Sequence, residues 1–147
     1  IVGDKDNDYG RKMEAKTIQS PCSARIHFTG KVQNVSDYYS IADVFVLPTL
    51  DEGRREGCPV SLLEAMASGL PVVASDIPGV KDILYSFPEH MFEAGSKEDL
   101  RNTMEKMLSN RKFEQCKNKF RFFIKQHYSI EREIDQHQTV YRKCLNH

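Results

Sequence analysis

The chain of 147 residues lacks several features that would assign it to a class of protein at once. Its 21 basic and 21 acidic residues cancel, so no overall field favours nucleic acid or an anionic membrane as a partner. No apolar run approaches the length of a membrane span, and no signal peptide begins the chain. These absences favour a cytoplasmic globular protein, and the length suffices for one domain with its own core.

Signals for disulfides and metal sites are missing as well. The histidines show no metal-ligand spacing, and the closely spaced aspartates in 4–8 follow a glycine turn, where aspartate commonly caps a helix. The cysteines form no CxxC pair, which favours a reduced intracellular chain over a disulfide framework (Cys22, Cys58, Cys116 and Cys144). We therefore expect no metal and no other cofactor.

The chain does contain short apolar runs that alternate with helical patterns, as in a parallel sheet with crossover helices. The continuously apolar runs 44–47 and 71–74 are typical of strands covered on both faces. The pattern predicts a single α/β domain over 1–147, with a Rossmann-like parallel sheet and helices on both faces in 1–95 and a helical part in 96–147. About five strands are expected, near 1–3, 25–29, 44–48, 71–75 and 91–93. Helices are expected near 8–20, 34–41, 60–68, 79–84, 97–109, 111–127 and 130–144.

The most informative segment is 56–75, where two glutamates eight residues apart are joined by a Gly/Pro loop that opens a helix. Gly57 and Pro59 prevent one continuous helix from Glu56 to Glu64, so the two carboxylates lie on different elements. Even in a helix they would be about 12 Å apart, too far to share one proton. The spacing suits two ends of an elongated ligand, and the helix N-terminus between them attracts phosphate. The segment therefore predicts a nucleotide-sugar site.

The same segment contains four features in succession: Glu56-Gly57, the run 62–67, Gly69 and the run 71–74. This order resembles the glutamate-x7-glutamate signature of the group 1 (family 4) glycosyltransferases, and the resemblance covers about residues 1–95. It implies the GT-B architecture, in which two Rossmann-like domains face each other across a cleft. The chain would be the C-terminal, donor-binding domain, and the N-terminal acceptor domain would be absent. Because the first residue is Ile rather than Met and begins a mid-domain strand pattern, we expect an excised C-terminal piece.

The resemblance also implies a reaction: a sugar moves from a nucleoside diphosphate donor to a glycan, lipid or small-molecule acceptor, with retention and without a metal. Glu56 is the catalytic candidate and would orient the donor sugar together with the backbone of 57–60. Glu64 would hold the ribose hydroxyls. Lys31 and Val32 occupy the place where the family recognises the nucleotide base. The turn at 3–5 departs from the family's Gly-x-Gly turn. The further donor-binding candidates are Gly3, Arg54, Gly57, Cys58, Pro59, Val60 and Ser61.

Several of these residues have a structural alternative. Ser61 and Glu64 fit a capping box, in which Ser61 caps the helix and Glu64 reaches back to the N–H of the cap. Glu64 could have this capping role without ligand and bind the ribose when a nucleotide is present. Gly57 could serve as a turn residue with positive φ. Lys31 could belong to an ordinary strand-to-helix loop. Cys58 is rejected as a nucleophile because nothing in the sequence near it marks an activating base.

Two arginines precede the first glutamate. Arg54 and Arg55 would suit bidentate contacts to a diphosphate. Because Asp51 and Glu52 are adjacent, local pairing is an alternative, and it is the favoured one for Arg55.

Two further functions stay open at this point. One is a nucleotide-sugar 2-epimerase-like enzyme, which would need acid and base groups from another domain. The other is a non-catalytic nucleotide-binding or interaction module of the same fold. The expected partners are a nucleotide-sugar and the chain's own missing N-terminal domain, with no nucleic acid and with membrane contact only at the periphery, through the missing domain. We expect the chain alone to be inactive as a transferase.

Overall fold

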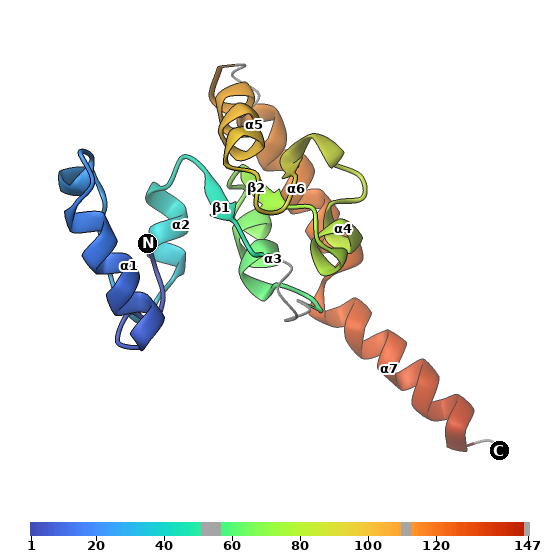
Figure 1. Ribbon diagram of the computed structural model, residues 1–147. Coiled ribbons are helices and arrows are strands. Elements are labelled where there is room, and N and C mark those ends of the chain that lie inside the picture. The colour runs from blue at the N-terminus through green and yellow to red at the C-terminus, as the bar shows by residue number, and fades with distance from the viewer. Residues whose placement is uncertain (51–56, 110–112, 146–147) are drawn as a thin grey trace. The chain divides into compact units, whose positions relative to one another are not determined.

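The computed structural model describes residues 1–50, 57–109 and 113–145 (Figure 1). The chain divides into two compact units, unit 1 (Ile1–Tyr38) and unit 2 (Tyr39–His147).

Unit 1 is built around a helix that is packed on the loop preceding it. The helix α1 (Asp8–Ile18) begins where the side chain of Asn7 accepts a hydrogen bond from the backbone N–H of Gly10 at 2.8 Å. A Cβ on Gly10 would lie 2.5 Å from the carbonyl oxygen of Lys5, so this close approach requires glycine. A short 3-10 turn, η1 (Ser23–Arg25), follows, and α2 (Ser36–Ile41) begins in unit 1 and ends in unit 2.

The two strands predicted in unit 1 are wrong as strands. The described chain has instead an isolated parallel bridge between Val2 and Gly30, just beyond the second predicted strand. Hydrogen bonds from Thr29 N to Ile1 O and from Gly3 N to Gly30 O flank it. Within the described part of unit 1 no third segment pairs with the two bridged segments. Because a lone two-stranded pairing is marginal, the ladder does not extend.

Unit 2 holds a parallel three-stranded sheet of order β1-β2-β3. Its strands are β1 (Phe45–Leu47), β2 (Val72–Ser75) and β3 (Met91–Phe92), with Val46 opposite Val73 and Ala74 opposite Met91. The central strand β2 is buried along its whole length, whereas β1 is half-buried because it pairs with only one strand in the described sheet. The prediction that both runs are fully covered is therefore confirmed for β2 only.

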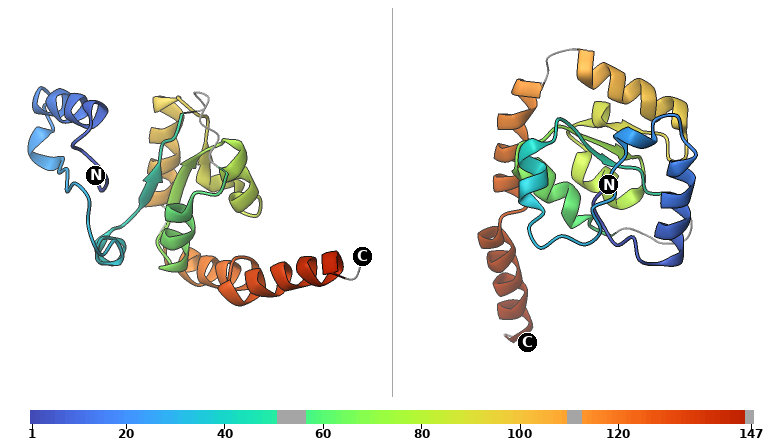
Figure 2. Two further views of the ribbon diagram at one scale, coloured as in Figure 1. Left: turned by 90° about the horizontal axis from the view of Figure 1, so that it is seen from below. Right: turned by 90° about the vertical axis from the view of Figure 1, so that its left-hand side faces the viewer.

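Helices surround these strands in unit 2 (Figure 2). α3 (Val60–Ala67) packs on α6 (Phe113–His127) and on the first two strands, and α5 (Lys97–Ser109) packs on β2 and β3. A cluster of Val73, Phe92 and Met107 joins the sheet to α5. The elements are α3 (Val60–Ala67), α4 (Pro78–Leu84), η2 (Pro88–His90), α5 (Lys97–Ser109), α6 (Phe113–His127) and α7 (Ile130–Leu145).

All seven predicted helices occur, with ends within two residues of those expected, whereas η1 and η2 were not predicted. The apolar face predicted for 111–127 is buried where the structure describes it. Phe120 is fully buried, and the centroid of its ring lies 4.9 Å from that of Phe87. Helix α7 differs, since no residue in it is buried, and Figure 1 shows it leading away from the strands of unit 2. None of the described helices is long and apolar enough to cross a membrane.

Candidate functional site

The candidate site lies in unit 2, where the chain leaves β1 and enters α3. Parallel strands point their carboxyl ends to one edge of the sheet, and ligands of α/β proteins commonly bind there. Three predicted site residues, Glu56, Arg54 and Arg55, fall outside the described residues, so their predicted roles stay predictions. The site is therefore built from the residues that follow them.

The N-terminus of α3 is open at the position where the sequence predicts an anion site. The helix begins at Val60, and the preceding Pro59 makes no side-chain cap. The carbonyl of Pro59 accepts from the N–H groups of Leu62 at 3.0 Å and Leu63 at 3.4 Å. No residue in the described part of the chain accepts from the N–H groups of Val60 and Ser61. These donors and the helix dipole make the first turn of α3 attractive to an anion.

The predicted capping box at this helix is wrong. Ser61 lies inside the first turn rather than at the N-cap, which Pro59 occupies, so its hydroxyl is not placed to cap the helix. The carboxylate of Glu64 instead accepts a hydrogen bond from the hydroxyl of Tyr39, with 3.2 Å between Oη and Oε2. Glu64 itself is exposed, so it projects from a well-anchored helix toward solvent.

Helix α3 is anchored on its other face and at its far end. Leu62 and Met66 are fully buried. At the C-terminus of α3, Arg121 of α6 donates from Nη2 to the carbonyl of Ser68 at 2.7 Å. Gly69 has φ +77°, and a Cβ there would lie 2.9 Å from Nε of Arg121, so glycine leaves room for this contact. These contacts fix the position of α3, and with it the position of its open N-terminus.

Tyr39 is a site residue that was not predicted from the sequence. Its side chain is 8% exposed, and burial, followed by the hydrogen bond to and the charge of Glu64, raises its pKa to about 12. The hydroxyl therefore stays protonated at neutral pH and donates. A tyrosine one helix before a strand carries no signal of such a role, because the partner Glu64 lies 25 residues away.

Two described residues shortly before α3 face solvent. Gly57 and Cys58 are both exposed, and a Cβ on Gly57 would meet nothing within 4 Å. Because Gly57 directly follows residues that lie outside the described part of the chain, the alternative of a positive-φ turn there stays a prediction. The open space over its backbone leaves room for a ligand to approach closely.

Unit 1 holds the other predicted site residues, Gly3, Lys31 and Val32. Gly3 has φ +147°, which favours glycine, and Lys31 Nζ lies 3.0 Å from Oδ2 of Asp4. The hydrogen bond from Lys31, followed by one from the backbone N–H of Asp6, lowers the pKa of the Asp4 carboxyl. Lys31 thus has a local partner, as the loop alternative expects, and Val32 is half-buried. Gly3, Lys31 and Val32 thus belong to unit 1, whereas Glu64 and the start of α3 belong to unit 2. The predicted site residues therefore form two groups, one in each unit.

No metal site was predicted from the sequence. Within residues 1–50, 57–109 and 113–145, no three His, Cys, Asp or Glu side chains are placed to hold a metal ion together. The aspartates near the N-terminus are used locally: Oδ1 of Asp4 accepts from the N–H of Asp6 at 3.0 Å, while Asn7 rather than an aspartate caps α1. The absence of a metal requirement stays a prediction.

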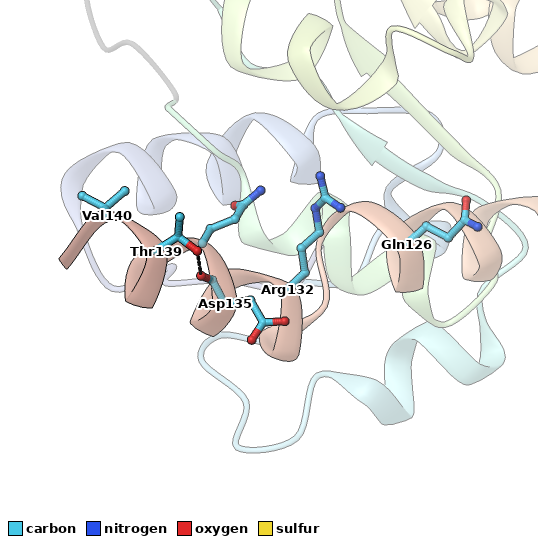
Figure 3. A pocket seen from close by; sticks show the side chains of 6 residues that line it. Gln126, Arg132, Asp135, Thr139 and Val140 are labelled. Carbon is cyan, nitrogen blue, oxygen red and sulfur yellow. Dashed lines mark hydrogen bonds between the residues drawn. The ribbon is translucent and has the colours of Figure 1, made fainter. Parts of the chain in front are cut away.

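A surface hollow of unit 2 lies elsewhere, along α6 and α7 (Figure 3). It shares no residue with the candidate site. The hydroxyl of Thr139 donates to the carbonyl of Asp135 at 2.8 Å, so part of its polar lining is already satisfied within α7. The lining residues are Gln126, Arg132, Asp135, Gln136, Thr139 and Val140.

Comparison with known proteins adds independent evidence. The family described as "Glycosyl transferases group 1" matches residues 1–110. A protein of Haemophilus influenzae named "Uncharacterized glycosyltransferase" is 30% identical over 144 residues, which is 95% of this chain and 38% of that protein. The lipopolysaccharide core biosynthesis mannosyltransferase LpsB of Rhizobium meliloti is 34% identical over 73 residues, 50% of this chain and 20% of that protein. The chain therefore spans well under half the length of these relatives.

Solved structures agree on the fold. A sucrose-phosphate synthase of Thermosynechococcus elongatus superposes with a TM-score of 0.85 at 23% identity, over 99% of this chain and 38% of that chain. A glycosyltransferase of Rickettsia africae superposes with a TM-score of 0.88 at 15% identity, over 98% of this chain and 39% of that chain. The resemblance that the 56–75 segment predicts is confirmed, and the chain belongs to the group 1 glycosyltransferases.

Proposed function

We propose that the chain is the donor-binding domain of a glycosyltransferase that moves a sugar from a nucleoside diphosphate to an acceptor. The observation that carries the proposal is the start of α3, where the exposed carboxylate of Glu64 lies about one turn after Val60 and Ser61, whose N–H groups have no acceptor among the described residues. An anion-accepting helix end next to a hydroxyl-binding carboxylate suits a nucleotide's phosphate and ribose. The match to the group 1 family over this same segment supports the assignment.

The departing diphosphate needs its developing negative charge stabilised. In the proposed reaction the α3 N-terminus supplies a fixed positive field, which is strongest where water is excluded. Arg54 would add a guanidinium, and Glu56 with the backbone of 57–60 would orient the donor sugar. Transfer with retention and without a metal belongs to the same proposal.

The acceptor side of the reaction would lie outside this chain. The chain spans 38% of the H. influenzae relative, which leaves room in a full-length protein for an N-terminal acceptor domain. One relative is named for lipopolysaccharide core biosynthesis and another for amylovoran biosynthesis. These names support a growing glycan or glycolipid as the acceptor class.

The proposal is tested by calorimetric titration of the chain with UDP, GDP and ADP, with their monophosphates and with the free nucleosides. At least one diphosphate should bind, more tightly than its monophosphate and both more tightly than the nucleoside, because each phosphate adds contacts to the α3 end. Binding should persist in a chelator and weaken with salt, since an open site is screened over about 8–10 Å.

The same titration can overturn each part of the proposal separately. A strict need for magnesium or manganese would remove the metal-free site. An affinity that does not depend on the number of phosphates would show that the α3 end is not the anion site. Binding of none of the nine ligands would remove donor binding altogether and favour a non-catalytic interaction module.

A further inference from the structure

Tyr39 is a buried residue whose hydroxyl donates to the exposed Glu64 of the candidate site. Its ring packs edge-on against Phe45 of β1, with ring centroids 6.0 Å apart and an interplanar angle of 73°. The side chain is 8% exposed, so apolar packing fixes the position of the ring. The hydroxyl at its tip lies 3.2 Å from Oε2 of Glu64 and 3.3 Å from the carbonyl oxygen of Ser61.

One proton serves these two acceptors. A tyrosine hydroxyl has a single hydrogen to donate, and a carboxylate accepts more strongly than a backbone carbonyl. The stronger bond therefore goes to Glu64, while the Ser61 carbonyl keeps the hydroxyl close to the first turn of α3. The tyrosine thus ties the acidic side chain to the same turn that offers the free N–H groups.

This bond has a consequence for an otherwise mobile group. An exposed glutamate samples several rotamers, and ordering such a side chain on ligand binding costs conformational entropy. With Oε2 held by a rigid buried ring, part of that ordering is complete before a ligand arrives. No described residue forms a hydrogen bond with Oε1, so this second oxygen stays available to a ligand hydroxyl.

We propose that Tyr39 is a positioning residue that holds the Glu64 carboxylate ready for the two ribose hydroxyls of the donor nucleotide. The inference rests on the proposed donor-binding function and adds to it a second residue that governs selectivity for ribose. It places the tyrosine behind the carboxylate, in contact with Glu64 and not with the ligand.

The test is Tyr39→Phe in the 147-residue chain, which keeps the ring and removes only the hydroxyl. Each of UDP, GDP and ADP is titrated beside its 2′-deoxy and 3′-deoxy counterparts, and the ratio of ribose to deoxyribose affinity is the readout. The wild-type chain should prefer the ribose form about tenfold or more, because a charged hydrogen bond is lost with each hydroxyl. Tyr39→Phe should reduce that preference by about three- to tenfold, because it should lower the affinity for the ribose forms more than that for the deoxy forms, which keep only one hydroxyl for Glu64 to bind.

Two further variants separate positioning from stability. Ile83→Val removes one methyl from a fully buried position on α4 and lowers stability without touching Glu64, so its ribose preference should equal that of the wild type. In a Glu64→Ala background, Tyr39→Phe should cause no further loss of ribose preference, since the group that it positions is gone.

Each outcome decides a different statement. A wild-type chain that binds a diphosphate, with Tyr39→Phe keeping the full ribose preference, overturns the positioning role and leaves the proposed function standing. Equal extra loss from Tyr39→Phe with and without Glu64 also overturns it, because the tyrosine would then act independently. A wild-type chain that binds no nucleoside diphosphate overturns both the proposed function and this inference.

Discussion

Helices α6 and α7 are neighbours of similar length and similar amphipathic pattern, yet unit 2 uses them in opposite ways. In α6, Phe120 is fully buried and Ile124 is only 9% exposed. In α7 no residue is buried, and Ile130 and Tyr141 are 71% and 64% exposed. The partners of α6 are within the chain, in α3 and Phe87. Apolar periodicity therefore predicts that a helix has a face to cover, but not whether the cover lies in the same chain.

The difference bears on function because α6 holds α3, and α3 carries the candidate site. α6 packs on α3, and Arg121 of α6 holds the end of α3 that is opposite the proposed anion site. Among the described residues, α7 has no comparable packing on α3. Substitutions in α6 should therefore affect folding and nucleotide binding together, while those in α7 should affect neither in this chain.

The largest effect is expected from Phe120→Ala, which empties the centre of the α6 interface. Removing a fully buried phenylalanine should lower the free energy of unfolding by about 3–5 kcal/mol, measured by urea denaturation. Phe122→Ala on the same helix is the matched control, since Phe122 is 63% exposed and its loss should cost little. Equal costs for both variants would mean that α6 does not pack as described.

Glu64→Ala should come next and should separate binding from stability. It removes a charged hydrogen-bond partner from the proposed ribose site, so nucleoside diphosphate affinity should fall about tenfold or more. Because Glu64 is exposed and does not cap α3, the midpoint of urea unfolding should move much less than for Phe120→Ala. Unchanged affinity for UDP, GDP and ADP, with at least one of them bound by the wild type, would leave Glu64 without the proposed role.

Most of this arrangement could be predicted from the sequence, and the misses have physical causes. Helix positions follow from local periodicity, and the place of α3 follows from Gly57, Pro59 and Gly69. The burial of β2 follows from its continuous apolar run. The strands of unit 1 fail because they need further partners, and an apolar run cannot show whether those partners are present. Tyr39 was missed because its bond to Glu64 joins residues distant in sequence. The capping box was wrong because the N-cap of α3 is Pro59, which places Ser61 inside the first turn.

Arg121→Met tests the contact by which α6 fixes the end of α3. The guanidinium donates to a helix C-terminal carbonyl, a favourable position for a cation, so its loss should destabilise unit 2 by about 1 kcal/mol. Arg142→Met in the last turn of α7 is the matched control and should change the unfolding midpoint by less. Should both variants behave alike, the Arg121 contact would contribute no more than an ordinary surface charge.

The smallest effect is expected from Ile134→Ala in α7, and it is the sharpest test of the comparison. Ile134 is 49% exposed, so its truncation should change the free energy of unfolding by less than about 0.5 kcal/mol, whereas Ile124→Ala in α6 should cost about 2–4 kcal/mol. Amide hydrogen exchange should show the same order, fast along α7 and slow along α6 and β2, because opening of a helix without buried contacts requires little free energy. Slow exchange along α7 together with a large cost for Ile134→Ala would mean that its apolar face is covered in solution, for example by a second copy of the chain, and would show as protection that rises with protein concentration. The same face lying uncovered in this chain and protected in a longer protein that carries the N-terminal domain would instead place the missing partner of α7 in that domain.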